Sequence, residues 1–103
     1  MTLHIDLNDV SKMIYLPGGL IVALLDRLGQ ERRYSRAECA RNIYLVDADG
    51  KIIWQVESDF DADGGPFTNV LDTEGEINAY RWDGGMYAID IHSGHATPIS
   101  LIR

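Results

Sequence analysis

Residues 42–56 read NIYLVDADGKIIWQV, two apolar runs on either side of an Asp-Gly pair. Both runs are rich in β-branched and aromatic residues, which favour strands. Asp49-Gly50 supplies the positive-φ positions that a tight hairpin turn requires. In the second run, Ile52, Trp54 and Val56 occupy every other position, which places one face of a strand on the core. Residues 42–47 and 51–56 are therefore predicted to form a β-hairpin.

The same pattern of apolar runs separated by turn residues recurs on both sides of this hairpin. Further apolar runs end at turns rich in Gly, Pro and Asp, and the strands expected between them are 13–16, 20–25, 67–71, 76–82, 86–91 and about 96–102. About seven or eight short strands at this spacing predict a mainly all-β fold, an antiparallel meander that forms a twisted sheet, a sandwich or a partial barrel. With 103 residues, the chain is expected to be a single domain, 1–103.

Two segments depart from simple alternation. Residues 20–25, LIVALL, are apolar on both faces, as expected of a central strand. Residues 27–41 break the strand pattern. Within them, Ser35-Arg-Ala-Glu38 matches a capping box, so one short helix is predicted near 36–41.

Charge is the most informative bulk property of the chain. Its net charge is −7, and residues 42–103 carry eleven acids against three bases, whereas residues 1–41 are close to neutral. An acidic surface repels nucleic acid and anionic membranes and attracts basic proteins or cations. The sequence therefore predicts neither a nucleic-acid nor a membrane partner. Acidic residues that only maintain solubility are the alternative interpretation.

The location is predicted to be cytoplasmic. Cys39 is the single cysteine, so no internal disulfide can form, which suits a reducing compartment. The first residues show no basic segment followed by an apolar stretch, so no signal peptide is expected. The longest apolar run, 13–25, is interrupted by Pro17-Gly18-Gly19 and is shorter than a membrane span.

An internal sequence repeat is found in two of the hairpins. The segment from Tyr44 through Gly50 parallels the segment from Tyr87 through Gly94, at a spacing of 43 residues. Such a period is typical of four-stranded propeller blades. The pattern aromatic–x–aliphatic–Asp before a turn glycine, with Trp54 a few residues on, resembles the quinoprotein-type (PQQ-like) β-propeller repeat.

Two copies of this repeat are too few to close a propeller. Over about residues 42–95 the chain is more similar to small bacterial proteins with blade-like hairpins, among them candidate immunity proteins of contact-dependent growth inhibition and other polymorphic toxin systems. This resemblance implies a role in binding a toxin. The quinone-binding residues of quinoproteins have no counterpart here, so no cofactor is expected.

Two patterns resemble metal sites. Asp59-Phe-Asp61-Ala-Asp63-Gly64 matches the opening of a calcium loop, but Val70 stands where the loop's bidentate Glu belongs. An acidic loop between strands is the favoured interpretation. His92 and His95 could meet at one turn, but they lack a clear third ligand. No metal site is predicted.

No arrangement typical of an enzyme is present. Cys39 would need a positioned base to act as a nucleophile, and the sequence contains no supported Ser–His–Asp order, phosphate-binding loop or dinucleotide fingerprint. The chain is therefore predicted not to be an enzyme, and no residue is assigned a catalytic role.

The aromatic side chains near residue 80 are candidates for a binding surface. Alternation places Tyr80 and Trp82 on the face opposite Ile77 and Ala79. If Ile77 and Ala79 face the core, Tyr80 and Trp82 form an exposed patch with Asp83, of the kind that dominates protein interfaces. Burial in a second core layer is the alternative. It is favoured for Trp54, whereas both alternatives stay open for Trp82.

Size, charge and the resemblance together favour a non-catalytic protein-binding protein, an immunity protein that neutralises a cognate, basic, nuclease-type toxin by occlusion. The candidate partner-binding residues are Glu57, Asp59, Asp61, Asp63, Glu74, Glu76, Tyr80, Trp82 and Asp83. Two alternatives stay open. One is a self-associating structural β module, such as a homodimer joined through sheet edges. The other is a cation-binding domain that uses the 59–63 loop.

Overall fold

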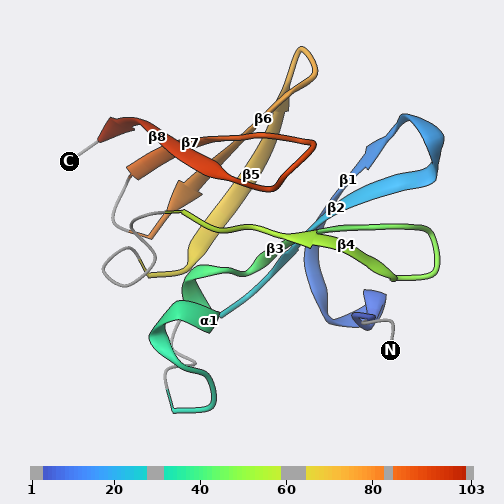
Figure 1. Cartoon of the computed structure of the whole chain (residues 1–103). Helices are drawn as coiled ribbons and strands as arrows, with labels where there is room; N and C mark the ends of the chain where they lie inside the picture. Colours follow the sequence, from blue (N-terminus) through green and yellow to red (C-terminus); the bar gives the residue numbers. More distant parts are fainter. Residues whose placement is uncertain (1–3, 28–31, 59–64, 83–84, 102–103) are drawn as a thin grey trace.

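A computed structural model describes residues 4–27, 32–58, 65–82 and 85–101. The described strands form two antiparallel four-stranded sheets, in which strands that are neighbours in the sequence are also neighbours in the sheet (Figure 1). The first sheet contains β1 (Val10–Leu16), β2 (Leu20–Leu25), β3 (Ile43–Val46) and β4 (Ile52–Gln55). The second contains β5 (Phe67–Thr73), β6 (Glu76–Arg81), β7 (Gly85–Ile89) and β8 (Ala96–Leu101). The predicted all-β fold is confirmed, as two packed sheets and not as a closed barrel.

The local signals in the sequence act as expected. Helix α1 (Arg36–Ala40) begins after Ser35, whose Oγ accepts the Glu38 N–H at 3.2 Å. The turn between β1 and β2 is the 3-10 segment η2 (Pro17–Gly19), which places two glycines at positive φ. A second 3-10 segment, η1 (Leu7–Asp9), precedes β1. Within the described parts of the chain, no helix is long and apolar enough to cross a membrane.

One apolar core lies between the two sheets. The sheets contribute similar numbers of buried side chains to it: Val22, Leu24, Ile43, Leu45, Trp54 and Val56 from the first, and Phe67, Val70, Ile77, Ala79, Tyr87, Ile89 and Ala96 from the second. Burial of each larger aliphatic or aromatic side chain contributes roughly 1.5–3 kcal/mol. Residues 21–25 of β2 are all buried, as predicted for a central strand. Ile52 is only half-buried, because the register of β3 and β4 shifts beside it.

Backbone pairing joins the sheets at one edge. Glu57 follows β4 and forms a parallel bridge with His95, just before β8. Its N–H donates to the Gly94 carbonyl at 3.2 Å, and its carbonyl accepts the Ala96 N–H at 2.8 Å. Because backbone hydrogen bonds are directional, this bridge fixes how the end of the first sheet meets the β7–β8 turn of the second.

A buried asparagine clamps the sheets at a second place. Asn42 is 1% exposed, and its amide nitrogen donates to the carbonyls of Leu25 and Phe67 at 2.7 and 2.8 Å. Its amide oxygen accepts the Phe67 N–H at 2.9 Å. One side chain therefore hydrogen-bonds to backbone groups at the end of β2 and at the start of β5.

The internal sequence repeat corresponds to equivalent turns in the two sheets. In each sheet the turn joins the third strand to the fourth, and an Asp side chain caps it. Asp47 Oδ1 accepts the N–H groups of Asp49 and Lys51, and Asp90 Oδ1 accepts that of His92 at 2.9 Å. The repeat is thus a repeated turn within two similar meanders, while its likeness to propeller blades stays a prediction.

Candidate protein-binding surface

The described candidate residues lie mostly on the surface. Glu57, Glu74 and Glu76 are exposed, and Tyr80 is half-buried. Trp82 is 59% exposed, whereas Trp54 is 8% exposed and lies in the core. The two tryptophans therefore separate into one core residue and one surface residue. Asp59, Asp61, Asp63 and Asp83 lie outside the described residues.

The structure does not bring these residues into one patch. Glu74 and Glu76 lie at the β5–β6 turn, and Trp82 follows the other end of β6. A strand rises about 3.3 Å per residue, so the two ends of β6 are roughly 20 Å apart. A partner that touches both ends would have to cover most of this sheet.

Trp82 rests on the segment that leads into β5. The backbone N–H of Trp82 donates to the Pro66 carbonyl at 3.1 Å. Gly65 lies directly against the indole, since a Cβ at Gly65 would be 2.1 Å from the indole nitrogen. Backbone supports one part of the indole while the residue stays more than half exposed, so Trp82 is a surface residue and not part of the core.

Arg81, next to Trp82, is the feature that the sequence analysis missed. It is 1% exposed, and its guanidinium carbon lies 4.2 Å from the Phe67 ring centroid and 4.7 Å from that of Tyr87. It donates to the Gly65 carbonyl and to Ser58 Oγ, the latter at 2.9 Å. Ser58 and Gly65 flank residues 59–64, so one buried cation holds both ends of the acidic segment against the second sheet.

Alternation along β6 contained the signal for this burial. Ile77 and Ala79 face the core, and Arg81 occupies the next position on the same face. The predicted binding surface instead rested on Tyr80 and Trp82, which belong to the opposite face of this strand. A basic residue that continues the core-facing alternation of a strand is therefore a candidate for a buried anchor.

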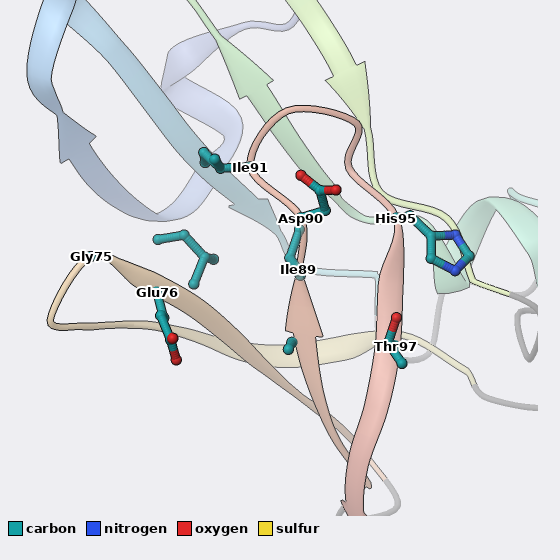
Figure 2. A pocket seen from close by; sticks show the side chains of 9 residues that line it. Gly75, Glu76, Ile89, Asp90, Ile91, His95 and Thr97 are labelled. Carbon is teal, nitrogen blue, oxygen red and sulfur yellow. The ribbon is translucent and has the colours of Figure 1, made fainter.

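A hollow of about 460 Å³ lies at the end of the second sheet (Figure 2). Its lining includes Glu76 from β6, Ala88 from β7 and Thr97 from β8. Asp90, just after β7, and His95, just before β8, also line it. Among the described residues, no group of three His, Cys, Asp or Glu side chains could hold a metal ion. Cys39 is buried within α1 and does not line this hollow.

The outer face of the first sheet carries a titratable group with a displaced pKa. Burial raises the pKa of the Tyr44 phenol above its ordinary value of about 10, and the Glu38 carboxylate raises it further. Arg27 opposes this shift. Gln55 Nε2 donates to Tyr44 Oη at 3.0 Å and to the Arg41 carbonyl at 2.8 Å, which links β3, β4 and the end of α1.

Tyr44 is expected to make stability fall at alkaline pH. Because the pKa is higher in the folded than in the unfolded chain, the contribution is complete below about pH 10 and is lost as pH rises through the folded pKa. Free energies of unfolding measured in urea between about pH 9 and pH 11 should fall more steeply for the natural protein than for Tyr44→Phe. Parallel pH profiles would contradict this assignment.

A family comparison covers most of the chain. A family profile described as a domain of unknown function, DUF7957, matches residues 2–101. The chain belongs to this family. DUF7957 thus spans both sheets, and its description assigns no activity. No match to the chain was found among curated proteins or among solved structures.

Proposed function

We propose that the chain is a non-catalytic inhibitor that binds a basic protein, and that it serves as a cytoplasmic immunity protein for a nuclease-type toxin. The toxin assignment rests on the sequence resemblance over residues 42–95. The binding assignment rests on the surface. The mechanism is occlusion, in which the acidic surface covers the basic face with which a nuclease holds its nucleic acid.

One observation carries the binding assignment: within the part of the chain that the structure describes, the exposed glutamates lack an ion-pair partner. Glu57, Glu74 and Glu76 form no ion pair with any described residue. Among the described residues after Asn42, the basic side chains are Lys51 and Arg81, and Arg81 is buried in the core. The exposed carboxylates of the second sheet therefore have no basic side chain paired with them among the described residues, and they attract a basic partner.

Trp82 supplies an apolar contact for the partner in addition to the acidic side chains. Large aromatic side chains at the centre of an interface commonly contribute 2 kcal/mol or more when truncated. Trp82→Ala is expected to weaken partner binding by about thirtyfold or more, with little change in stability. The control is Tyr15→Ala, because Tyr15 is 73% exposed on β1 of the other sheet.

Affinity capture from the native cells, followed by an inhibition assay, tests this function. The tagged chain is incubated with lysate at low salt, and each retained basic protein is then produced alone and together with the chain. We expect one stoichiometric partner that is toxic by itself and harmless when co-produced. A partner whose toxicity is unchanged by the chain would refute the immunity role.

Self-association is the second candidate, favoured by exposed apolar residues on edge strands. Tyr15 on β1, Ile53 on β4 and Ile99 on β8 are each more than half exposed. Edge strands with apolar side chains are sites where two chains can pair. Sedimentation of the purified chain separates the candidates, since a stable dimer that captures no other protein would favour this second role.

A further inference from the structure

Strand β6 carries a row of side chains on the face that points away from the core. This row alternates with the core-facing residues of the strand, and its members are Glu76, Asn78, Tyr80 and, just after the strand, Trp82. Glu76 is exposed at one end of the row, and Trp82 is 59% exposed at the other. Asn78 lies between them and is only 7% exposed. The outer row of β6 therefore contains an acid, a largely buried amide and two aromatic rings.

The side-chain amide of Asn78 is left without a partner inside the described structure. Asn78 pairs in register with Leu71 of β5 and Ala88 of β7, and neither side chain carries a polar group. The amide forms no hydrogen bond with any described residue, although more than nine-tenths of Asn78 is buried. Its nitrogen and oxygen both retain some contact with solvent. Burial of an unpaired amide costs free energy, so a ligand that pairs with this amide gains stabilisation that the chain itself does not provide.

Asn42 of the same chain shows what such an amide binds well. Its Nδ2 donates to the Phe67 carbonyl at 2.8 Å, and its Oδ1 accepts the Phe67 N–H at 2.9 Å. One amide thus pairs with both backbone groups of a single residue. A ligand that suits Asn78 in the same way is an extended peptide segment, because residues inside a helix use their N–H and C=O groups within the helix.

The side chains around this amide select the chemistry of the segment. Leu71, Met86 and Ala88 are half-buried and place apolar surface beside the row. Glu76 forms no ion pair with a described residue, so it favours a basic side chain at its end of the row. Trp82 offers a ring at the other end. At about 3.3 Å per residue the row is roughly 20 Å long, which an extended segment of about six residues covers.

We propose that the outer row of β6 binds an extended segment of the basic partner protein, with Asn78 hydrogen-bonded to one of its backbone amide groups. The proposal deepens the proposed function, on which it rests for the choice of a basic protein. Charge complementarity at Glu76 favours such a partner over a second copy of this acidic chain. The first sheet offers no equivalent row on β2, because Ile21, Ala23 and Leu25, which alternate with its core residues, are themselves buried.

Titration of the ¹⁵N-labelled full chain with the peptide acetyl-Lys-Val-Lys-Val-Lys-Val-amide tests this row without any natural partner. The peptide alternates basic with β-branched side chains, which favour an extended backbone. We expect the side-chain NH₂ signals of Asn78 to shift, together with backbone amide signals of residues 71, 76–80 and 86–88. The control peptide has the same side chains but N-methylated backbone amides, so it keeps the charge and lacks the donors. It should bind about tenfold more weakly and leave the Asn78 NH₂ signals in place.

Asn78→Leu separates binding from folding, and it also assigns the NH₂ signals by their loss. The variant removes an amide that has no partner in the described chain, so the urea midpoint of unfolding should stay the same or rise while peptide affinity falls about tenfold. Asn42→Leu is the matched control, because that amide is equally buried but hydrogen-bonded, so its urea midpoint should fall sharply. Asn78→Asp keeps the acceptor, loses the donor and adds negative charge, and it should also bind the peptide more weakly.

Four results would overturn the proposal. They are equal binding by Asn78→Leu, equal binding of the N-methylated peptide, tighter binding by Asn78→Asp, and shifts of the Asn78 NH₂ signals on concentrating the chain alone. The third would indicate general attraction to an acidic surface, and the fourth would make a second copy the occupant. If the peptide binds as expected but the chain inhibits no basic protein, the proposed function fails and the binding row stands. If Asn78→Leu neutralises the partner with unchanged affinity, the row is wrong and the proposed function stands.

Discussion

Replacing Arg81 with alanine is expected to lower the free energy of unfolding by about 3–5 kcal/mol, a large part of the total stability of a small domain. The substitution removes the hydrogen bonds to Gly65 and Ser58 and the packing of the guanidinium on the Phe67 and Tyr87 rings. Urea denaturation followed by fluorescence measures the loss. We also expect faster proteolysis within residues 59–64, because their flanks lose a shared anchor.

Two further variants identify which property of Arg81 matters. Arg81→Met retains much of the volume but none of the hydrogen bonds, so it should cost about half as much. Arg27→Ala is the matched control, because Arg27 also stacks on a ring, that of Tyr34 at 4.4 Å, but is only half-buried. It should change stability by no more than about 0.5 kcal/mol. Equal effects of Arg27→Ala and Arg81→Ala would contradict the anchoring role.

Gly94→Ala is expected to cost about 2–4 kcal/mol, through two separate causes. Gly94 has φ +80°, where an L-residue is strained, and an added Cβ would lie 2.6 Å from the Trp54 ring. The ring cannot move away without losing its hydrogen bond to the Ile91 carbonyl. Thermal and urea unfolding should both show the loss, together with altered near-ultraviolet dichroism from Trp54.

Gly75→Ala isolates the contact from the backbone strain. Gly75 has a similar φ of +86°, but an added Cβ there meets nothing within 4 Å. Its substitution should cost only about 1–2 kcal/mol. The difference between the two variants measures the Trp54–Gly94 contact. Identical losses would show that Trp54 yields freely, and that this contact does not position the β7–β8 turn.

The hairpins were predictable because their signals are local. Asp49-Gly50 and Pro17-Gly18-Gly19 set turn geometry within a few residues, and Ser35 caps α1 through an atom three positions away. The junction between the sheets was not predictable in this way. Asn42 binds backbone groups 17 and 25 residues away, and Glu57 pairs with His95. Neither interaction leaves a trace in hydrophobic periodicity.

The sequence predicted only part of the candidate surface. The sequence favoured burial for Trp54, as the structure shows, but left both alternatives open for Trp82, which also stands in an alternating strand pattern. The difference is tertiary: Trp54 is covered by the β7–β8 turn at Gly94, whereas Trp82 lies on Gly65 with its outer side open. The separation of Trp82 from Glu74 and Glu76 likewise follows from the direction of β6.

The central claim is that negative surface charge guides the chain onto a basic protein. The most direct test is the association rate with the captured partner at about 50 and about 300 mM salt. We expect this rate to fall about tenfold or more with salt, and Asp59/Asp61/Asp63→Lys to be slow at both concentrations. The control is Asp9/Glu38/Asp49→Lys, which changes three exposed acids elsewhere by the same charge. It should associate clearly faster than the loop variant. A rate that is independent of salt and unchanged in the loop variant would contradict the claim.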